Sequence, residues 1–130
     1  MTTKKKILLI DDDKDFLFAT KLIIEKAGYE VFMAEDGKSG VEMWKSIMPD
    51  LVIIDMMMET WGEGFSVLAK IRATDAGQNT PLFILSAVDL QGSYGSYEPP
   101  PEFPKLNRVL HKPIKAEELL GYIAQELKNK

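Results

Sequence analysis

Acidic side chains stand directly after two apolar runs of the chain. Asp11 and Asp12 follow residues 6–10, and Asp55 follows residues 51–54. If both runs are strands of a parallel sheet, their carboxyl ends lie at one edge and bring the carboxylates together. Two like charges about 4 Å apart repel by about 4 kcal/mol at an effective dielectric of 20, so such a cluster needs a cation. Oxygen ligands without His or Cys favour Mg²⁺ or Mn²⁺ over zinc.

Two more polar residues follow later apolar runs. Ser86 comes after residues 81–85, and Lys112 comes after residues 109–111. At the same sheet edge they would supply a hydroxyl donor and a compact positive charge, which suit phosphate oxygens. A carboxylate that attacks phosphorus forms an acyl phosphate, and this transfer needs positioning and charge neutralisation above all. These residue types therefore predict a phosphoryl-transfer site.

The elements that would position these residues alternate along the chain. Apolar runs predict strands at 6–10, 30–34, 51–54, 81–85 and 109–111. Apolar residues at helical spacing predict helices at 14–27, 37–47, 64–73 and 116–128. Asp13 is the expected N-cap of the first helix, and Gly28 its expected stop. Strands that are apolar throughout favour a parallel sheet, and the alternation with right-handed crossovers predicts a doubly wound α/β fold.

Residues 87–107 interrupt this alternation. Four of the seven prolines fall there, at positions 99, 100, 101 and 104. Proline inside a helix costs roughly 3 kcal/mol or more. We therefore expect a long loop with at most one helical turn where a fourth helix would belong. Loops of this length are uncommon in compact domains and are often functional.

Length and composition predict one globular domain over residues 1–130. The chain is 45% hydrophobic and 28% charged, with no cysteine and a formal net charge of −4. This balance argues against a nucleic-acid surface, and the lack of cysteine excludes disulfides and thiolate metal sites. No apolar run approaches the roughly 20 residues of a membrane helix. We expect a cytoplasmic protein that binds neither nucleic acid nor membrane.

Four segments, LLIDDDKDF, PDLVIIDMMM, FILSA and HKPI, follow one another in the order found in response-regulator receiver domains, which the chain resembles over about residues 5–127. The resemblance implies a flavodoxin-like five-stranded parallel sheet in the order 2-1-3-4-5. It implies that Asp55 is the phosphoacceptor and Ser86 the switch hydroxyl. It implies that Lys112 pairs with a phosphoryl oxygen and that the Lys112–Pro113 peptide bond is cis.

The resemblance also implies a metal site and partners. Asp12 would bind Mg²⁺ directly, Asp11 directly or through water, and Asp55 and the main-chain carbonyl of Met57 would complete the protein ligands. A sensor histidine kinase or a phosphotransfer protein would donate the phosphoryl group. The phosphorylated domain would act on a downstream protein or dimerise. It would be a signalling phosphoacceptor and not an enzyme, beyond self-phosphorylation from small donors and autodephosphorylation.

The sequence departs from the usual family pattern at residues of the surface that would pass the signal to a partner. Glu59 stands where a proline is usual, the segment ETWGEG is one residue longer, and Val109 replaces the usual Tyr or Phe. DMMMET together with the proline-rich segment resembles an atypical receiver subgroup. These departures alter the surface that would switch and leave the phosphorylation residues in place.

Two other functions compete with this interpretation. A haloacid-dehalogenase-type phosphatase also uses a strand-end DxD, here Asp11-x-Asp13, although the acidic pair expected near the C-terminus and a cap domain are missing. A receiver fold used only for protein binding would not be phosphorylated. Read alone, Asp11 to Asp13 would be helix-capping residues. His111 is adjacent to Lys112 on a strand and is interpreted as a packing or surface residue.

Overall fold

The five predicted strands form one parallel sheet. The computed structural model describes residues 4–56, 62–86, 107–111 and 114–128. The strands lie in the order β2-β1-β3-β4-β5, which confirms the predicted fold class. Their bounds are β1 Lys6–Ile10, β2 Glu30–Ala34, β3 Leu51–Met56, β4 Leu82–Ser86 and β5 Arg108–His111.

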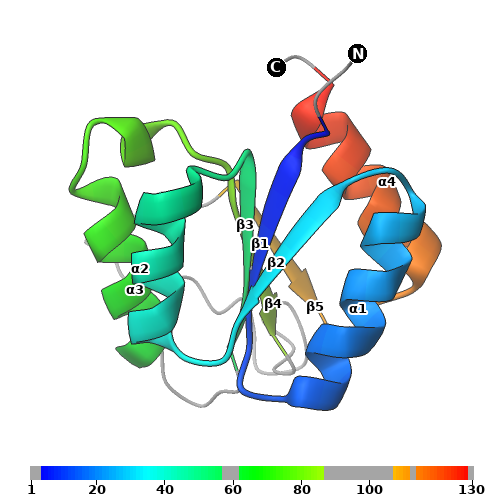
Figure 1. Cartoon of the computed structure of the whole chain (residues 1–130), viewed down its shortest axis with the longest axis horizontal. Coiled ribbons are helices and arrows are strands. Elements are labelled where there is room, and N and C mark those ends of the chain that lie inside the picture. The colour runs from blue at the N-terminus through cyan, green and yellow to red at the C-terminus, as the bar shows by residue number, and fades with distance from the viewer. Residues whose placement is uncertain (1–3, 57–61, 87–106, 112–113, 129–130) are drawn as a thin grey trace, which may run out of the picture.

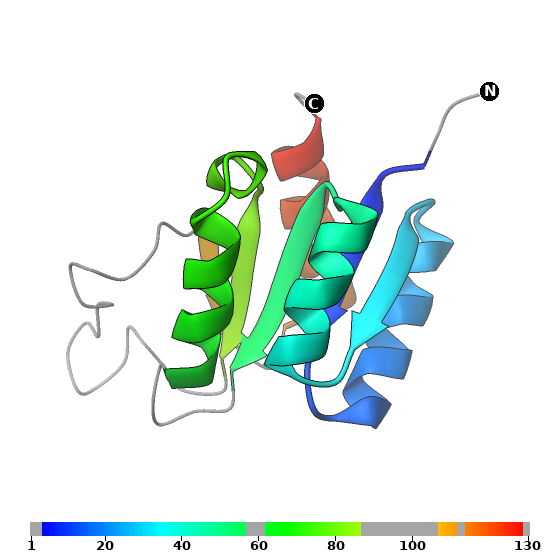
Figure 2. The ribbon, with the colours of Figure 1, turned by 60° about the vertical axis from the view of Figure 1, so that its left-hand side comes forward.

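Helices cover both faces of this sheet. Their bounds are α1 Lys14–Lys26, α2 Gly37–Ile47, α3 Gly62–Arg72 and α4 Ala116–Leu127, with a short 3-10 helix η1 at Ala76–Gln78. Figures 1 and 2 show α1 and α4 on one face and α2 and α3 on the other. Each face has its own buried apolar cluster, one around Leu8, Ile54 and Trp44, the other around Leu9, Ile53 and Ile24. Among the helices described, none has the length and apolar character needed to cross a membrane.

The ends of α1 follow the predicted capping chemistry. The Asp13 carboxylate accepts hydrogen bonds from the backbone N–H groups of Asp15 at 3.0 Å and Phe16 at 3.2 Å. These are two of the donors that a helix leaves without partners at its N-terminus. At the other end, Gly28 adopts φ +104°, where a side chain would be strained. Both predictions are confirmed.

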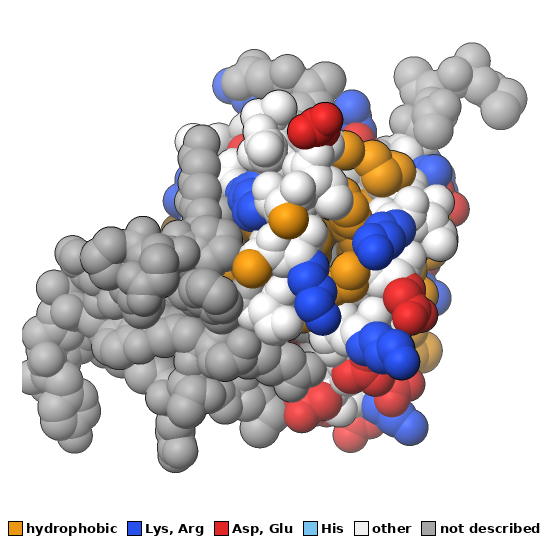
Figure 3. Space-filling view, turned by 90° about the vertical axis from the view of Figure 1, so that its left-hand side faces the viewer, with side chains coloured by type: hydrophobic (Ala, Val, Ile, Leu, Met, Phe, Trp, Pro, Cys, Tyr) orange, Lys and Arg blue, Asp and Glu red, His pale blue; other side chains and the backbone are white. Residues whose placement is uncertain are grey.

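The strand register explains why one edge of the sheet collects the polar residues. Ile10 of β1 pairs with Ile54 of β3, and Asp55 pairs with Leu85 of β4. All strands run the same way, so their carboxyl ends lie at one edge. Acidic side chains gather along the lower edge of the α2–α3 face in Figure 3, the end of the molecule at which the strands finish in Figure 1.

One element was not predicted. The η1 turn is held by Arg72, whose guanidinium donates to the carbonyls of Gly77 at 2.7 Å, Gln78 at 3.1 Å and Thr80 at 2.7 Å. Burial lowers the pKa of Arg72. The predicted loop over 87–107 lies, except for Asn107, outside the described residues.

Candidate functional site

Asp11 is buried at the end of β1 and is held by backbone hydrogen bonds. Its own N–H donates to the Ala34 carbonyl at 3.0 Å, which continues the pairing with β2. Its Oδ1 accepts from the Asp13 N–H at 2.9 Å. Only 3% of the residue is exposed. The carboxylate therefore has a defined orientation that the α1 cap residue helps to set.

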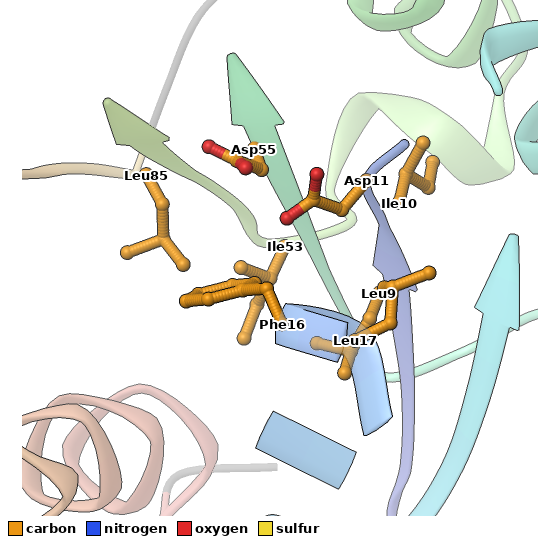
Figure 4. A pocket seen from close by; sticks show the side chains of 8 residues that line it. All are labelled: Leu9, Ile10, Asp11, Phe16, Leu17, Ile53, Asp55 and Leu85. Atoms are coloured by element: carbon orange, nitrogen blue, oxygen red, sulfur yellow. The ribbon is translucent and has the colours of Figure 1, made fainter. Parts of the chain in front are cut away.

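Asp55 occupies the corresponding place on the neighbouring strand. Asp11 follows Ile10, and Asp55 follows the partner Ile54, so the two aspartates are side by side across β1 and β3. Adjacent strands lie about 4.8 Å apart. Figure 4 shows the two carboxyl groups as neighbours on the same side of the sheet, with the Asp11 carboxyl pointing toward Asp55. This register brings together two aspartates that are 44 positions apart in the sequence.

A pocket with apolar walls lies beside these carboxylates (Figure 4). Its lining consists of two acids and six apolar side chains, namely Asp11, Asp55, Leu9, Ile10, Phe16, Leu17, Ile53 and Leu85. Most of the apolar members belong to the buried cluster under α1 and α4, with Phe16 packed partly buried against it. The acids therefore stand between solvent at the sheet edge and a dry interior.

The structure brings only part of the predicted metal set together. Asp12 is exposed and does not line the pocket. Within the residues that the structure describes, no three His, Cys, Asp or Glu side chains are grouped for a metal. Two neighbouring carboxylates nevertheless suit Mg²⁺, which commonly binds one or two protein carboxylates and keeps several waters. Met57, the predicted carbonyl ligand, lies outside the described residues.

The predicted phosphate-binding residues are only partly described. Ser86 is the last residue of β4, and its backbone pairs with Met56 of β3 and His111 of β5. This places Ser86 at the same edge as Asp55, although the structure does not describe its side chain. Lys112 and Pro113 lie outside the described residues, as do Glu59 and the rest of residues 57–61, whereas the end of the atypical segment begins α3 at Gly62.

Asp13 is placed as a helix cap, as predicted, and this weakens the phosphatase interpretation. One of its carboxylate oxygens is hydrogen-bonded to two backbone N–H groups of α1. A DxD phosphatase would need this side chain as a catalytic group beside Asp11. Here the Asp13 carboxylate is instead engaged in hydrogen bonds that cap α1.

Sequence reasoning missed the role of Phe16 in the pocket. Its apolar spacing identified it only as an inward-facing helix residue. The available signal was its position three residues after the cap Asp13, in the first turn of α1, which must lie at the sheet edge where β1 ends. A helix residue there can face the site as well as the core.

Comparisons with known proteins agree with one another on the family of this chain. The family model of the response regulator receiver domain matches residues 7–124. The chain is 30% identical over 125 residues to the transcriptional regulatory protein DltR of Streptococcus agalactiae, covering 91% of this chain and 50% of that protein. It is 29% identical over 119 residues to the DNA-binding dual master transcriptional regulator RpaA of Synechocystis sp., covering 91% and 47%. The chain thus spans about half the length of these curated relatives.

A solved structure extends the likeness to the whole fold. The receiver domain of sensor histidine kinase PA1611 from Pseudomonas aeruginosa superimposes with a TM-score of 0.80 at 25% identity, covering 97% of this chain and 99% of that one. That structure is described with a magnesium ion coordinated in the active site cleft.

Proposed function

Because the chain belongs to the response regulator receiver domain family, whose members are phosphoacceptor signalling domains, we propose that Asp55 is its phosphoacceptor. The single observation that carries the proposal is the placement of Asp55 opposite Asp11 at the carboxyl edge of the sheet (Figure 4). Asp55 is half-buried, whereas Asp11 is buried. Asp55 is therefore the better placed of the two to meet a phosphodonor.

The proposed reaction is a transfer of one phosphoryl group. A carboxylate oxygen of Asp55 attacks the phosphorus of the donor, a P–O bond forms, and the bond from phosphorus to the leaving group breaks with its electron pair on the leaving group. The donor is the phosphohistidine of a sensor kinase or phosphotransfer protein, or a small acyl phosphate. Lys112 would neutralise a phosphoryl oxygen, and the Ser86 hydroxyl would donate to another.

Asp11 and Asp12 are proposed as the metal-binding acids, with Asp55 and the Met57 carbonyl. The side-by-side position of Asp11 and Asp55 supports this, because two neighbouring carboxylates next to an incoming phosphoryl group accumulate negative charge. A bound Mg²⁺ would neutralise that charge. The hydrogen bond from the Asp13 N–H to Asp11 Oδ1 would orient the carboxylate for this purpose.

The signal would be passed to a protein partner that recognises the phosphorylated domain. The curated relatives are transcriptional regulators about twice as long as this chain. The acceptor chemistry proposed for Asp55 does not depend on which partner receives the signal.

Phosphorylation by acetyl phosphate tests the acceptor directly. The chain is incubated with acetyl phosphate and Mg²⁺, and intact-mass and peptide mass spectrometry locate the added group. We expect one phosphoryl group, on Asp55, which is absent without Mg²⁺ and absent in Asp55→Asn. Asp75→Asn is the matched control, since Asp75 is exposed and its side chain makes no capping bond.

Other results would support the competing functions. An acyl phosphate on another aspartate refutes the acceptor assignment. Steady turnover of a phosphate ester that requires Asp11 and survives Asp55→Asn indicates a phosphatase. No phosphorylation, together with no binding of beryllofluoride and Mg²⁺, indicates a receiver fold used only for protein binding.

A further inference from the structure

The ring of Phe16 forms part of the wall beside the proposed acceptor. Phe16 lines the pocket together with Asp55, Asp11 and the apolar side chains of Ile53 and Leu85. Figure 4 shows the ring lying on the same side of the sheet as the two carboxyl groups, next to Ile53. Of the pocket residues, Phe16 and Leu17 alone come from a helix; the others belong to strands or, in Asp11, directly follow one.

The start of α1 holds this ring in place. The backbone N–H of Phe16 donates to the Asp13 carboxylate at 3.2 Å, and the N–H of Asp13 donates to Asp11 at 2.9 Å. The ring itself packs partly buried against the core cluster that contains Leu17 and Leu85. One cap residue thus connects the Phe16 backbone to the Asp11 carboxylate.

The inner face of α1 is already filled without Phe16. Leu17, Thr20 and Ile24 are the buried residues of the helix. Phe16 stands at the pocket end of this row and is only half-buried. Because this position is partly exposed, a polar side chain there would keep its contact with solvent. It would, however, bring water beside Asp55.

We propose that Phe16 sets the lifetime of the acyl phosphate by keeping water away from the pocket side of Asp55. This inference rests on the proposed acceptor role of Asp55. In the hydrolysis, a water oxygen bonds to phosphorus, the bond from phosphorus to the Asp55 oxygen breaks, and its electron pair stays on the carboxylate. The water proton leaves to solvent, and inorganic phosphate is released. An apolar wall restricts the directions from which water can approach this group.

Two variants with the same side-chain connectivity separate polarity from loss of the ring. Leu and Asn have equal numbers of side-chain heavy atoms with the same branching, so Phe16→Leu and Phe16→Asn both remove the ring while differing in their affinity for water. We expect Phe16→Leu to keep a lifetime close to that of the unchanged chain. We expect Phe16→Asn to hydrolyse about tenfold faster than Phe16→Leu, which corresponds to about 1.4 kcal/mol of the barrier.

Phe18 supplies the matched control on the same helix. It is the same residue type two positions away, is 59% exposed and does not line the pocket. Phe18→Asn should leave the lifetime unchanged. Each variant is phosphorylated with acetyl phosphate, separated from the donor and followed by intact-mass spectrometry in Mg²⁺ buffer, with its melting temperature recorded in parallel.

The outcomes distinguish this inference from the proposed function. Equal rates for Phe16→Leu and Phe16→Asn overturn it, whether both rates equal that of the unchanged chain or both exceed it, since a role in packing alone would depend on size. A faster rate in Phe18→Asn equal to that in Phe16→Asn overturns it as well. If the unchanged chain takes no phosphoryl group on Asp55, the proposed function itself fails.

Discussion

Repulsion between Asp11 and Asp55 should be measurable as a coupling energy in the unphosphorylated chain without metal. The two residues follow the paired positions Ile10 and Ile54, and neighbouring strands are about 4.8 Å apart. At about 5 Å, two unit charges repel by about 3 kcal/mol at an effective dielectric of 20 and by about 1 kcal/mol in water. Asp11 is buried and Asp55 half-buried, so we expect a coupling between about 1 and 3 kcal/mol.

A double-mutant cycle isolates this term. Asp11→Asn and Asp55→Asn each remove one charge at nearly constant shape, and Asn keeps an acceptor oxygen for the Asp13 N–H. Either variant relieves the whole repulsion, so the double variant should gain less stability than the sum of the two, by the coupling energy. Interactions of either acid with third groups cancel in the cycle.

The assay is urea unfolding in buffer containing a chelator, then with Mg²⁺. In the chelator, a coupling below about 0.5 kcal/mol lies within the usual additivity of distant sites and refutes the side-by-side placement of the charges. Mg²⁺ at ten times its Kd should stabilise the unchanged chain by about 1.4 kcal/mol, a rise in Tm of roughly 5 °C. Asp75→Asn, with its exposed side chain, controls for the change in net charge.

Two further predictions concern the elements that carry the site. A Cβ added at Gly40 would lie 2.5 Å from Ile10 Cδ1, so Gly40→Ala should lower the free energy of unfolding by about 1–3 kcal/mol. In an Ile10→Ala background, which removes all three Ile10 carbons that lie within 3.4 Å of this Cβ, the same change should be neutral or stabilising, and equal losses in both backgrounds would contradict the clash. Hydrogen bonds from Ser39, chiefly from its backbone N–H, lower the pKa of Asp36. The stability contributed by the ionised Asp36 side chain is therefore present above the pKa of this group in the unfolded chain, and it is lost as the pH falls through the lower pKa in the folded chain. Asp36→Asn should therefore flatten the loss of stability below about pH 4 in urea titrations, and an unchanged pH profile would contradict this.

Most of the fold could be predicted from the sequence because its strands are apolar throughout. Uninterrupted runs such as Leu51–Ile54 mark the buried core of each strand. The ends are less certain, because polarity marks where burial changes and not where backbone pairing stops. β3 continues through Asp55 to Met56, since the backbone of Asp55 still pairs with Leu85 of β4.

Elements that depend on distant side chains could not be predicted. The η1 turn at Ala76–Gln78 has no apolar spacing of its own. It is stabilised by the Arg72 guanidinium, which also donates to the Asn107 side chain at 3.2 Å from a segment 35 positions away. For the same reason the pocket was missed. Its wall combines Phe16 of α1 with Leu85 of β4, and no local pattern connects those two residues.

Charge repulsion between Asp11 and Asp55 should lower the stability of the sheet that carries them. β1 and β3 are inner strands of the sheet, and Asp11 and Asp55 at their carboxyl ends lie side by side next to apolar side chains. The pairing holds because Ile10 and Ile54 are buried just below, so the repulsion is offset by apolar burial in the same two strands. Neutralising the acids should therefore stabilise the central pairing and through it the whole sheet. Any cation or phosphoryl group bound there is coupled to global stability as well as to local geometry.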